Sequence, residues 1–331
     1  MVTQDLLQKD IEYIVANAGL TKGDNGLEMP IVDINTLPAV SIIVPAYNAE
    51  KNIATLIESL LHLDYPKELR EIIIVDNNST DKTKTIVKRY PVTLLEENTI
   101  QSSYAARNEG IRNAKNAILV FCDSDCIATP QWVKEGVKVL VTESADLVGG
   151  QIEFIYSRRK TIAEQYDSTI HMRHEFCIKE QKFSTTANLF VKASLFDEIG
   201  MFSDRRKSGV DVQWTSKATK SGFLLVYSPE AVIKHPARPL KELLKKRFRV
   251  GAGMTYIELD EGKPLRAVTY SAFGLLLPPR ISSVRRIVQQ RGTPEMKEKV
   301  LSMWYVLYLC NLLTALGLLR SIFRSLCRRS P

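Results

Sequence analysis

The strongest constraint on the fold is a regular alternation of short apolar runs with helical patterns between residues 40 and 125. The apolar runs have the length of single strands and read VSIIVP (40–45), EIIIVD (71–76), PVTLLE (91–96) and NAILVFCDSD (116–125). Strands that are apolar along nearly their whole length are typical of a parallel sheet covered on both faces. Because helical stretches separate them, the sequence predicts a doubly wound α/β fold.

Polar side chains follow three of these runs at the point where each predicted strand ends. Tyr47 and Asn48 follow the first run, Asp76 ends the second, and Asp123 and Asp125 end the fourth. In open α/β sheets, ligands bind at the carboxyl ends of the strands. We therefore expect these five side chains to share one site.

The second half of the chain is less regular and predicts a mixed sheet. Strand-like runs are QIEFIY (151–156), ANLFV (187–191), FLLVYS (223–228) and AVIKH (231–235), and helices are expected over 160–177, 192–199, 211–221 and 239–258. We expect a Rossmann-like mixed sheet with helices on both faces, in one domain over residues 40–264. Apolar residues at helical spacing near the amino end predict a helical leader over residues 1–39.

The net charge of +8 is concentrated in the last fifth of the chain. Residues 265–331 hold eleven Lys or Arg and two Asp or Glu, mixed with the apolar runs 268–279 and 300–319. The second run has twenty uncharged residues, which as a helix is long enough to cross a bilayer. A basic, apolar helical tail fits an anionic membrane surface better than it fits a nucleic acid. We therefore expect membrane association and no nucleic-acid partner. The run 300–319 could cross the bilayer once, pair with 268–279 at the interface, or be a helix buried against the domain, and these alternatives stay open.

The acidic pair Asp123 and Asp125 is a candidate metal site. Two carboxylates two residues apart in a loop can approach one divalent cation, and such oxygen ligands suit Mg²⁺ or Mn²⁺. The pattern alone is weak, because many surface loops contain it. Its place at the end of a strongly apolar strand favours the metal site.

Asp76 and Tyr47 are candidates for holding a nucleotide base. A carboxylate at the end of a buried strand is costly unless it is paired, and it can accept a hydrogen bond from a base or a ribose hydroxyl. Tyr47 offers an aromatic face for stacking. A helix-capping turn around Ser79 and Asp81, and a core position for Tyr47, remain open as alternatives.

The motifs together resemble family 2 glycosyltransferases of the GT-A fold. VSIIVPAYNAEKNI, EIIIVDNNSTDKT, ARNEGI and FCDSDCIATPQW occur in the family's order, and the likeness continues through TTANLFVKASLFDEIGMF and VDVQWTSKATKSGFLLVYSPEAVIKHP. It covers about residues 40–254. The resemblance implies a metal-dependent, inverting transfer of a sugar from a nucleoside-diphosphate donor. It also implies a nucleotide-binding half over 40–130 and an acceptor half over 131–264.

The resemblance also implies roles for individual residues. Those expected on the nucleotide sugar are Pro45, Tyr47, Asn48, Asp76, Arg107 and Asp123. Those expected on the divalent cation are Asp123, Asp125 and His235. Asp211, in VDVQW, matches the aspartate of the family's ED pair and is the expected general base. Weaker expectations for the acceptor or the diphosphate are Thr186, Asn188, Arg247 and Arg249, and for the two arginines a solvated or membrane-facing helix side remains open.

The sequence departs from the family pattern at three places. Val210 replaces the usual Glu of the ED pair, Asn77 replaces the second Asp of the common VDDGS, and the QxxRW signature of processive synthases is absent after Asp211. The last departure argues against synthesis of a long polymer. His171, His174 and Cys177 at helical spacing allow a zinc site, although no fourth ligand is evident.

We therefore expect a glycosyltransferase that acts on a glycan or lipid-linked acceptor in cell-surface or extracellular polysaccharide synthesis. Its place would be the cytoplasmic face of a membrane, which in a bacterium is the inner membrane. Two alternatives are a non-catalytic relative that binds a nucleotide sugar and a sugar nucleotidyltransferase. The second lacks support, because PAYNAEKN after the first strand contains no glycine to grip a triphosphate.

Overall fold

The computed structural model describes residues 37–171, 173–260 and 262–327. The expected leader over residues 1–39 lies outside these residues except for 37–39. The strands are β1 (Val40–Ala46), β2 (Arg70–Asp76), β3 (Thr93–Glu96), β4 (Ile118–Cys122), β5 (Ile127–Ala128), β6 (Leu147–Ile155), β7 (Asn188–Lys192) and β8 (Leu225–Pro236). All four strand runs expected in the first half are present.

Among the described residues, these strands form one mixed sheet in the order β3-β2-β1-β4-β7-β6-β8-β5. β1 pairs in parallel with β2 and β4, and β2 pairs in parallel with β3. β7 is antiparallel to both β4 and β6, and β6 is parallel to β8. Consequently β8 runs in the same direction as β1, β2 and β4, and their carboxyl ends meet at one edge of the sheet.

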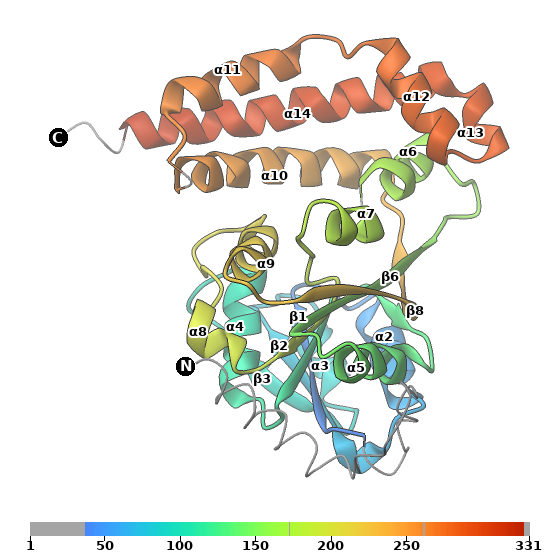
Figure 1. Cartoon of the computed structure of the whole chain (residues 1–331), viewed down its shortest axis with the longest axis vertical. Helices are drawn as coiled ribbons and strands as arrows, with labels where there is room; N and C mark the ends of the chain where they lie inside the picture. Colours follow the sequence, from blue (N-terminus) through green and yellow to red (C-terminus); the bar gives the residue numbers. More distant parts are fainter. Residues whose placement is uncertain (1–36, 172, 261, 328–331) are drawn as a thin grey trace, which may run out of the picture.

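Helices cover both faces of this sheet, as the sequence predicts (Figure 1). These helices are α2 (Ile53–Leu61), α3 (Thr83–Val87), α4 (Ser103–Asn113), α5 (Trp132–Thr142), α8 (Leu195–Ile199) and α9 (Val210–Lys220), with a short 3₁₀ turn at Lys67–Leu69. On one face, α2 and α5 pack a core around Ile42, Val44 and Trp132. On the other, α4, α8 and α9 pack around Ile43 and Phe121. Since β1 contributes to both cores, its run of apolar residues is explained.

The helix expected over 160–177 is interrupted in the structure. Its pieces are α6 (Ile162–Tyr166), a π-helical turn (Asp167–His171) and α7 (His174–Lys179). Asp167 is fully buried in the turn, and its carboxylate accepts hydrogen bonds from the backbone N–H and the guanidinium of Arg238. Helical spacing in the sequence does not reveal such a partner, because it lies on a distant segment.

Three other boundaries also differ. The stretch STDKTKTIVKRY (79–90), which separates two strands and is expected to be helical, forms only α3. Ahead of this helix the Asp81 carboxylate accepts hydrogen bonds from the backbone N–H and the hydroxyl of Thr83 and forms a turn. The helix expected over 192–199 begins at Leu195. The two runs 223–228 and 231–235 form the single strand β8, since an irregularity beside Gly150 and Gln151 shifts the register without breaking the pairing with β6.

The carboxyl-terminal part forms a separate layer of helices on top of the sheet domain (Figure 1). The helices are α10 (Leu240–Asp260), α11 (Leu265–Leu276), α12 (Ile281–Arg291), α13 (Pro294–Glu298) and α14 (Val300–Cys327). α10, the helix expected over 239–258, lies between α14 and the sheet domain. Two small cores, one around Met303 and Val288 and one around Leu318 and Val268, hold the layer together.

α10 and α14 cross in close contact because glycines face the partner backbone. A Cβ atom on Gly251 would lie 2.1 Å from the carbonyl oxygen of Thr314, and one on Gly317 would lie 2.2 Å from that of Phe248. Any larger side chain at these points would push the helices apart. Among the described residues, α14 is the one helix that is long and apolar enough to cross a membrane, and 44% of its most apolar window is buried inside the protein.

Candidate active site

The candidate site lies where the carboxyl ends of β1, β2, β4 and β8 meet. Tyr47 follows β1, Asp76 ends β2, Asp123 follows β4, and His235 is next to the last residue of β8. The parallel direction of these strands brings four separate segments of the chain to one edge. The expectation that strand-end residues share one site is therefore confirmed as an arrangement, while their roles stay predictions.

On the nucleotide side, Asp76 has one carboxylate oxygen committed and one without a partner. Oδ2 accepts a hydrogen bond from the backbone N–H of Ser79 at 2.9 Å. Oδ1 is buried and has no hydrogen-bond partner in the described structure. A buried polar atom without a partner is costly, so this oxygen is suited to accept a donor from a bound ligand.

Tyr47 and Asn48 lie beside this carboxylate's loop, in the turn after β1. The Tyr47 side chain is 50% exposed, so the alternative of a core tyrosine is excluded. Asn48 has a positive φ of 48° and uses its Oδ1 to accept a hydrogen bond from the backbone N–H of Thr80. Pro45 is buried within β1, two residues before Tyr47. The exposed Tyr47 ring is therefore accessible to a ligand in this turn.

Asp123 is held by a buried arginine. Nη2 of Arg107 donates to Oδ1 of Asp123 at 2.6 Å, and the Arg107 side chain is 3% exposed. Desolvation opposes ionisation of Asp123, but nearby positive charge, above all that of Arg107, outweighs it and lowers the pKa of this carboxyl. Asp123 is therefore a carboxylate at neutral pH, as a metal site requires.

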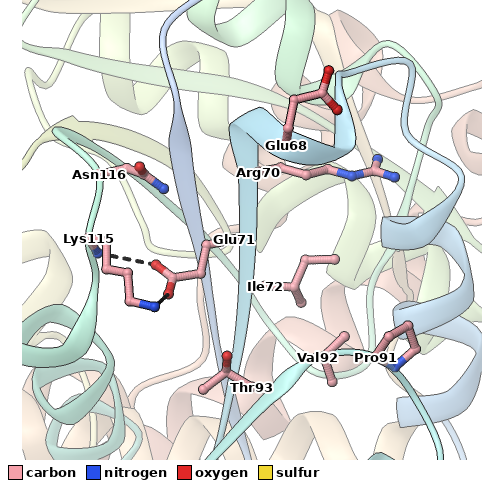
Figure 2. Close-up of a pocket in the computed structure, with 9 residues that line it drawn as sticks. All are labelled: Glu68, Arg70, Glu71, Ile72, Pro91, Val92, Thr93, Lys115 and Asn116. Carbon is pink, nitrogen blue, oxygen red and sulfur yellow. Dashed lines mark hydrogen bonds and ion pairs between the residues drawn. The ribbon is translucent and has the colours of Figure 1, made fainter.

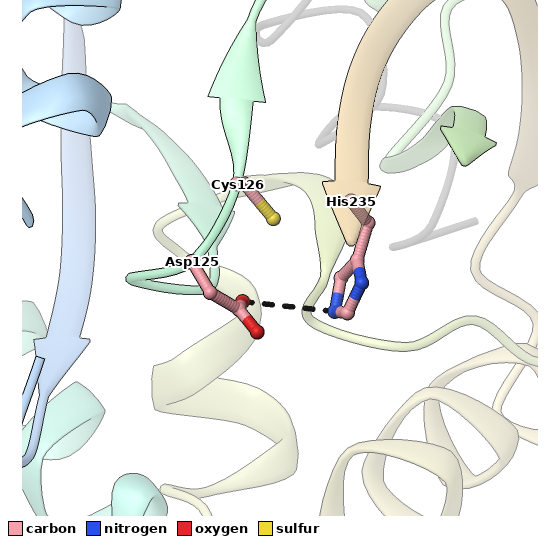
Figure 3. A group of neighbouring side chains, drawn as sticks. All are labelled: Asp125, Cys126 and His235. Carbon is pink, nitrogen blue, oxygen red and sulfur yellow. Dashed lines mark ion pairs between the residues drawn. The ribbon is translucent and has the colours of Figure 1, made fainter. Parts of the chain in front are cut away.

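Asp125 and His235 lie beside Asp123 and form with it the acidic cluster of the site, and the thiol of Cys126 lies next to them (Figure 3). Nε2 of His235 lies 3.7 Å from Oδ1 of Asp125 and 4.0 Å from Oδ2 of Asp123. Two carboxylates and an imidazole fit Mn²⁺ or Mg²⁺, with phosphate and water completing the shell. The sequence interpretation placed Asp123, Asp125 and His235 here but missed the thiol of Cys126.

Asp211, the expected general base, is positioned by three hydrogen bonds. It lies in the first turn of α9, after Gly209, whose φ of 80° starts the helix. Its Oδ1 accepts from the hydroxyl of Tyr104 at 2.9 Å. Its Oδ2 accepts from the backbone N–H and the hydroxyl of Thr186 at 3.2 and 3.3 Å.

The family's Glu is replaced by Val210, whose side chain packs in an apolar core. Val210 is 2% exposed and belongs to the core around Phe121. Tyr104, which sequence reasoning missed, instead supports Asp211 from α4. Burial, and then the negative charge of Asp211, raises the pKa of the Tyr104 phenol well above its usual value. Tyr104 therefore keeps its proton and donates a hydrogen bond to Asp211.

Positive charge gathers around the acidic cluster from residues that the sequence interpretation overlooked or named only in passing. Nη2 of Arg238 lies 3.1 Å from Nε2 of His235, and the same guanidinium bonds Asp167. Lys246, on α10, lies close enough to Asp123 to interact with it electrostatically. Burial, followed by the charge of Arg238, lowers the pKa of Lys246 to about 8. These cations are suited to a leaving diphosphate.

The weaker candidates separate into different environments. Thr186 contacts Asp211, but Asn188 is fully buried in the sheet: its Oδ1 accepts from Trp132, and its Nδ2 donates to two backbone carbonyls. The structure therefore does not bring Asn188 to the site. Arg249 is exposed on α10, and Arg247 lies near the buried Tyr166, where its charge opposes the rise that burial causes in the pKa of that phenol.

The zinc alternative has no support in the described residues. His174 is buried, its Nδ1 lies 2.7 Å from the carbonyl oxygen of Gly150, and its Nε2 accepts from the backbone N–H of Thr185. Both nitrogens are therefore used within the protein. The side chain of His171 lies outside the described residues.

A surface depression elsewhere on the molecule does not belong to this site (Figure 2). It lies at the opposite edge of the sheet, near the beginnings of β2 and β3, and is lined by residues such as Arg70, Glu71 and Asn116. Glu71 is already bonded there by Ser41 and Lys115. The candidate catalytic and metal-binding residues lie instead at the carboxyl ends of the parallel strands.

Fold and site together define an α/β nucleotide-dependent transferase with a mixed sheet and acidic strand ends. The sequence model of glycosyl transferase family 2 matches residues 41–211 of this chain. The chain is 37% identical over 299 residues to glycosyltransferase AglE of Haloferax volcanii, which covers 88% of this chain and 98% of that protein. The chain therefore belongs to glycosyl transferase family 2 and is a glycosyltransferase, which confirms the family inferred from the motifs.

Two further similarities are more distant. A dolichyl N-acetyl-α-D-glucosaminyl phosphate 3-β-D-2,3-diacetamido-2,3-dideoxy-β-D-glucuronosyltransferase of Methanococcus voltae is 27% identical over 230 residues, covering 64% of this chain and 72% of that protein. The mannosyltransferase PcManGT of Pyrobaculum calidifontis, solved with GDP-Man and Mn²⁺, matches with a TM-score of 0.50 at 20% identity, over 99% of this chain and 86% of that one. The structural match confirms the GT-A fold.

Proposed function

We propose that this glycosyltransferase transfers a sugar with inversion from a nucleoside-diphosphate donor to the hydroxyl of a lipid-linked glycan. The observation that carries the proposal is the arrangement of α4. Tyr104 and Arg107 lie one turn apart on this helix and hold Asp211 and Asp123, respectively. One rigid element thus fixes the distance between the candidate base and the candidate metal carboxylate.

Each group has a defined task in such a transfer. Asp211 accepts the proton of the acceptor hydroxyl as that oxygen attacks the anomeric carbon. The bond from that carbon to the diphosphate breaks, and Arg107, Arg238 and Lys246 stabilise the negative charge that develops on the leaving group. A divalent cation held by Asp123, Asp125 and His235 would supply further positive charge there. The likeness to a mannosyltransferase solved with Mn²⁺ supports this cofactor.

The donor base would lie between the Tyr47 ring and the free oxygen of Asp76. A carboxylate oxygen accepts a hydrogen bond from an N–H of a uracil- or guanine-type base, and the exposed ring offers stacking. The buried and unpaired state of Oδ1 supports this placement. Arg107 would approach the diphosphate from below.

The acceptor and the membrane are linked in this proposal. The Methanococcus relative is named for transfer to a dolichyl phosphate sugar, which supports a lipid-linked acceptor for this chain. Large apolar side chains are exposed on the helical layer at Tyr270, Phe273, Leu277, Leu301, Tyr305, Leu316, Phe323 and Leu326. Arg320 and Arg324 flank them on α14. A surface of this kind would hold the enzyme on the cytoplasmic face of a membrane, where nucleotide sugars are available.

The division into a catalytic domain over 40–264 and a tail over 265–331 remains part of the proposal. Family membership leaves the nucleotidyltransferase alternative without support. Val210, in place of the usual Glu, is the one feature that favours a non-catalytic relative, and the hydrogen bonds that position Asp211 support catalysis instead. α10 precedes the proposed boundary and α14 follows it, yet the two helices pack together. The boundary therefore divides two proposed functions and does not divide two folding units.

The test is donor turnover by the purified full chain in detergent, with Mn²⁺ and a panel of UDP- and GDP-sugars. Asp211→Asn should keep donor affinity and lose about 10²–10⁴ in transfer rate, because only the base is removed. Asp197→Asn, which changes an exposed carboxylate in the first turn of α8, is the matched control and should leave the rate unchanged. A near-normal rate in Asp211→Asn would exclude Asp211 as the base.

A further inference from the structure

Three ligand atoms of different chemical kinds converge beside the acidic pair. A carboxylate oxygen of Asp125, the sulfur of Cys126 and a ring nitrogen of His235 all lie within 4.8 Å of one another. Figure 3 shows the three side chains pointing into the same space. The proposed sugar transfer uses Asp125 and His235 but gives no task to the thiol.

The strand pairing explains why this thiol faces the histidine. β5 and β8 are antiparallel, with Ile127 opposite Lys234 and Ala128 opposite Ile233. One step further along the same register places Cys126 opposite His235. Directly opposite residues in an antiparallel pair point to the same face. Both side chains are almost completely buried, so the arrangement is held by the sheet itself.

His235 presents the nitrogen that a metal needs. Its Nδ1 lies 2.8 Å from the carbonyl oxygen of Pro236, which can only accept, so Nδ1 carries the proton. Nε2 therefore has the lone pair, which faces Asp125 and accepts a hydrogen bond from the guanidinium of Arg238 at 3.1 Å. A bound metal ion would take the place of this hydrogen bond. Metal-binding histidines in proteins are commonly oriented by such a hydrogen bond from the other ring nitrogen.

The donor set differs from the one that Mn²⁺ or Mg²⁺ prefers. Hard cations take carboxylate, phosphate and water oxygens, whereas a thiolate with an imidazole selects Zn²⁺ and related thiophilic ions. We propose that Asp125, Cys126 and His235 form a binding site for a thiophilic divalent cation, overlapping the position of the hard cation, so that such an ion blocks sugar transfer. As the metal–sulfur bond forms, the thiol proton leaves to solvent, and water completes the fourth position.

Cadmium is the probe that reports on the thiol directly. Titration of the full chain with Cd²⁺, without nucleotide, should produce a thiolate-to-cadmium charge-transfer absorption that saturates at one equivalent. Cys126→Ser should abolish this band. Cys177→Ser removes a half-buried thiol outside the cluster and should leave the band intact. A band that is absent from the unmodified protein, or that persists in Cys126→Ser, would overturn the proposal.

Two further measurements keep the result interpretable if Cys126→Ser folds poorly. Asp125→Asn retains the thiol and should weaken Cd²⁺ binding at least about tenfold, as loss of a ligand or its partner does in other metal sites. Unchanged affinity would show that Asp125 takes no part. Zn²⁺ should also inhibit Mn²⁺-supported turnover, and Cys126→Ser, relative to its own uninhibited rate, should need at least about tenfold more Zn²⁺ for half inhibition. Equal sensitivity would contradict the proposal.

The inference rests on the proposed metal position but not on sugar transfer. The cadmium band is measured without donor or acceptor, so it can appear in a chain that transfers no sugar. Conversely, a protein that turns over a donor with Mn²⁺ and gives no cadmium band would retain the proposed function and lose this inference.

Discussion

Lys246, near the site, changes its charge close to neutral pH. It lies on α10, and burial and Arg238 lower its pKa to about 8, against the opposing influence of Asp167 and Asp123. A lysine is positive below its pKa and neutral above it. Its contribution to stabilising a leaving diphosphate is therefore present at pH 7 and is lost as the pH rises through about 8.

We expect kcat/KM of the free enzyme to fall above about pH 8 for this reason. Lys246→Arg keeps a positive charge throughout this range, so its profile should lose that decline. Lys246→Met should lower kcat by about 10²-fold at every pH below the decline, as loss of one charge-stabilising donor does in other enzymes. The measurement is a pH profile for the three proteins with one donor and one acceptor. A decline of the same position in Lys246→Arg would assign it to another group.

Single residues were predictable where a motif fixes them and not where a distant partner does. Asp123, Asp125 and Asp211 follow from the motifs. The resemblance places Arg107 on the nucleotide sugar, and its hydrogen bond to Asp123 was not predicted. Tyr104 supports Asp211 across 107 residues of chain, and Arg238 bonds Asp167 across 71 residues. No local pattern contains such pairs.

Two helices of the carboxyl-terminal layer approach so closely that side chains are excluded at their crossing. Gly317 of α14 faces the backbone of α10 at Phe248, whereas Gly274 of α11 faces open space. The same substitution at these two glycines should therefore have opposite effects.

Gly317→Ala should destabilise the protein by about 1–3 kcal/mol, because the added methyl group meets backbone atoms that cannot yield. Gly274→Ala should leave stability unchanged or raise it by up to about 1 kcal/mol, since alanine favours the helix. Thermal unfolding of both variants in the same detergent measures the difference. A loss of stability at Gly274 equal to that at Gly317 would contradict the close crossing.

Whole elements were predicted well where their burial is uniform. The runs around Ile43, Ile73 and Val120 are buried on both sides, and their apolar pattern alone identified β1, β2 and β4. The prediction of one continuous helix over 160–177 was wrong, because a π-helical turn interrupts it where the buried Asp167 bonds Arg238. The continuity of β8 also depends on its pairing with β6, which the sequence of β8 does not contain.

At the scale of the whole molecule, the helical layer presents an apolar surface away from the sheet. Along α14, the exposed residues Leu301, Tyr305, Leu316 and Phe323 recur at helical spacing and therefore share one face. Large apolar side chains exposed together on one face favour an interaction site there. The surrounding arginines favour an anionic membrane as the partner.

The variant Leu301→Gln/Tyr305→Gln/Phe323→Gln should bind anionic vesicles at least about tenfold more weakly than the unmodified chain, because burial of each large apolar side chain contributes about 1.5–3 kcal/mol. Leu224→Gln changes an exposed leucine on the sheet domain and is the matched control. Cosedimentation with vesicles, together with thermal unfolding to confirm the fold, measures the effect. Equal binding by the triple variant would place the membrane contact elsewhere.

The position of α10 has a consequence for the acceptor. If the outer face of α14 rests on the bilayer, α14 and α10 stand between the lipid headgroups and the catalytic edge, a height of about 20 Å for two helices with their side chains. The reacting hydroxyl of a lipid-linked acceptor must therefore cross that distance, along the side of these helices for a short acceptor and at the end of its own glycan for a long one. Transfer to acceptors with one sugar and with several sugars on the same lipid phosphate, measured at equal concentration, would distinguish the two routes.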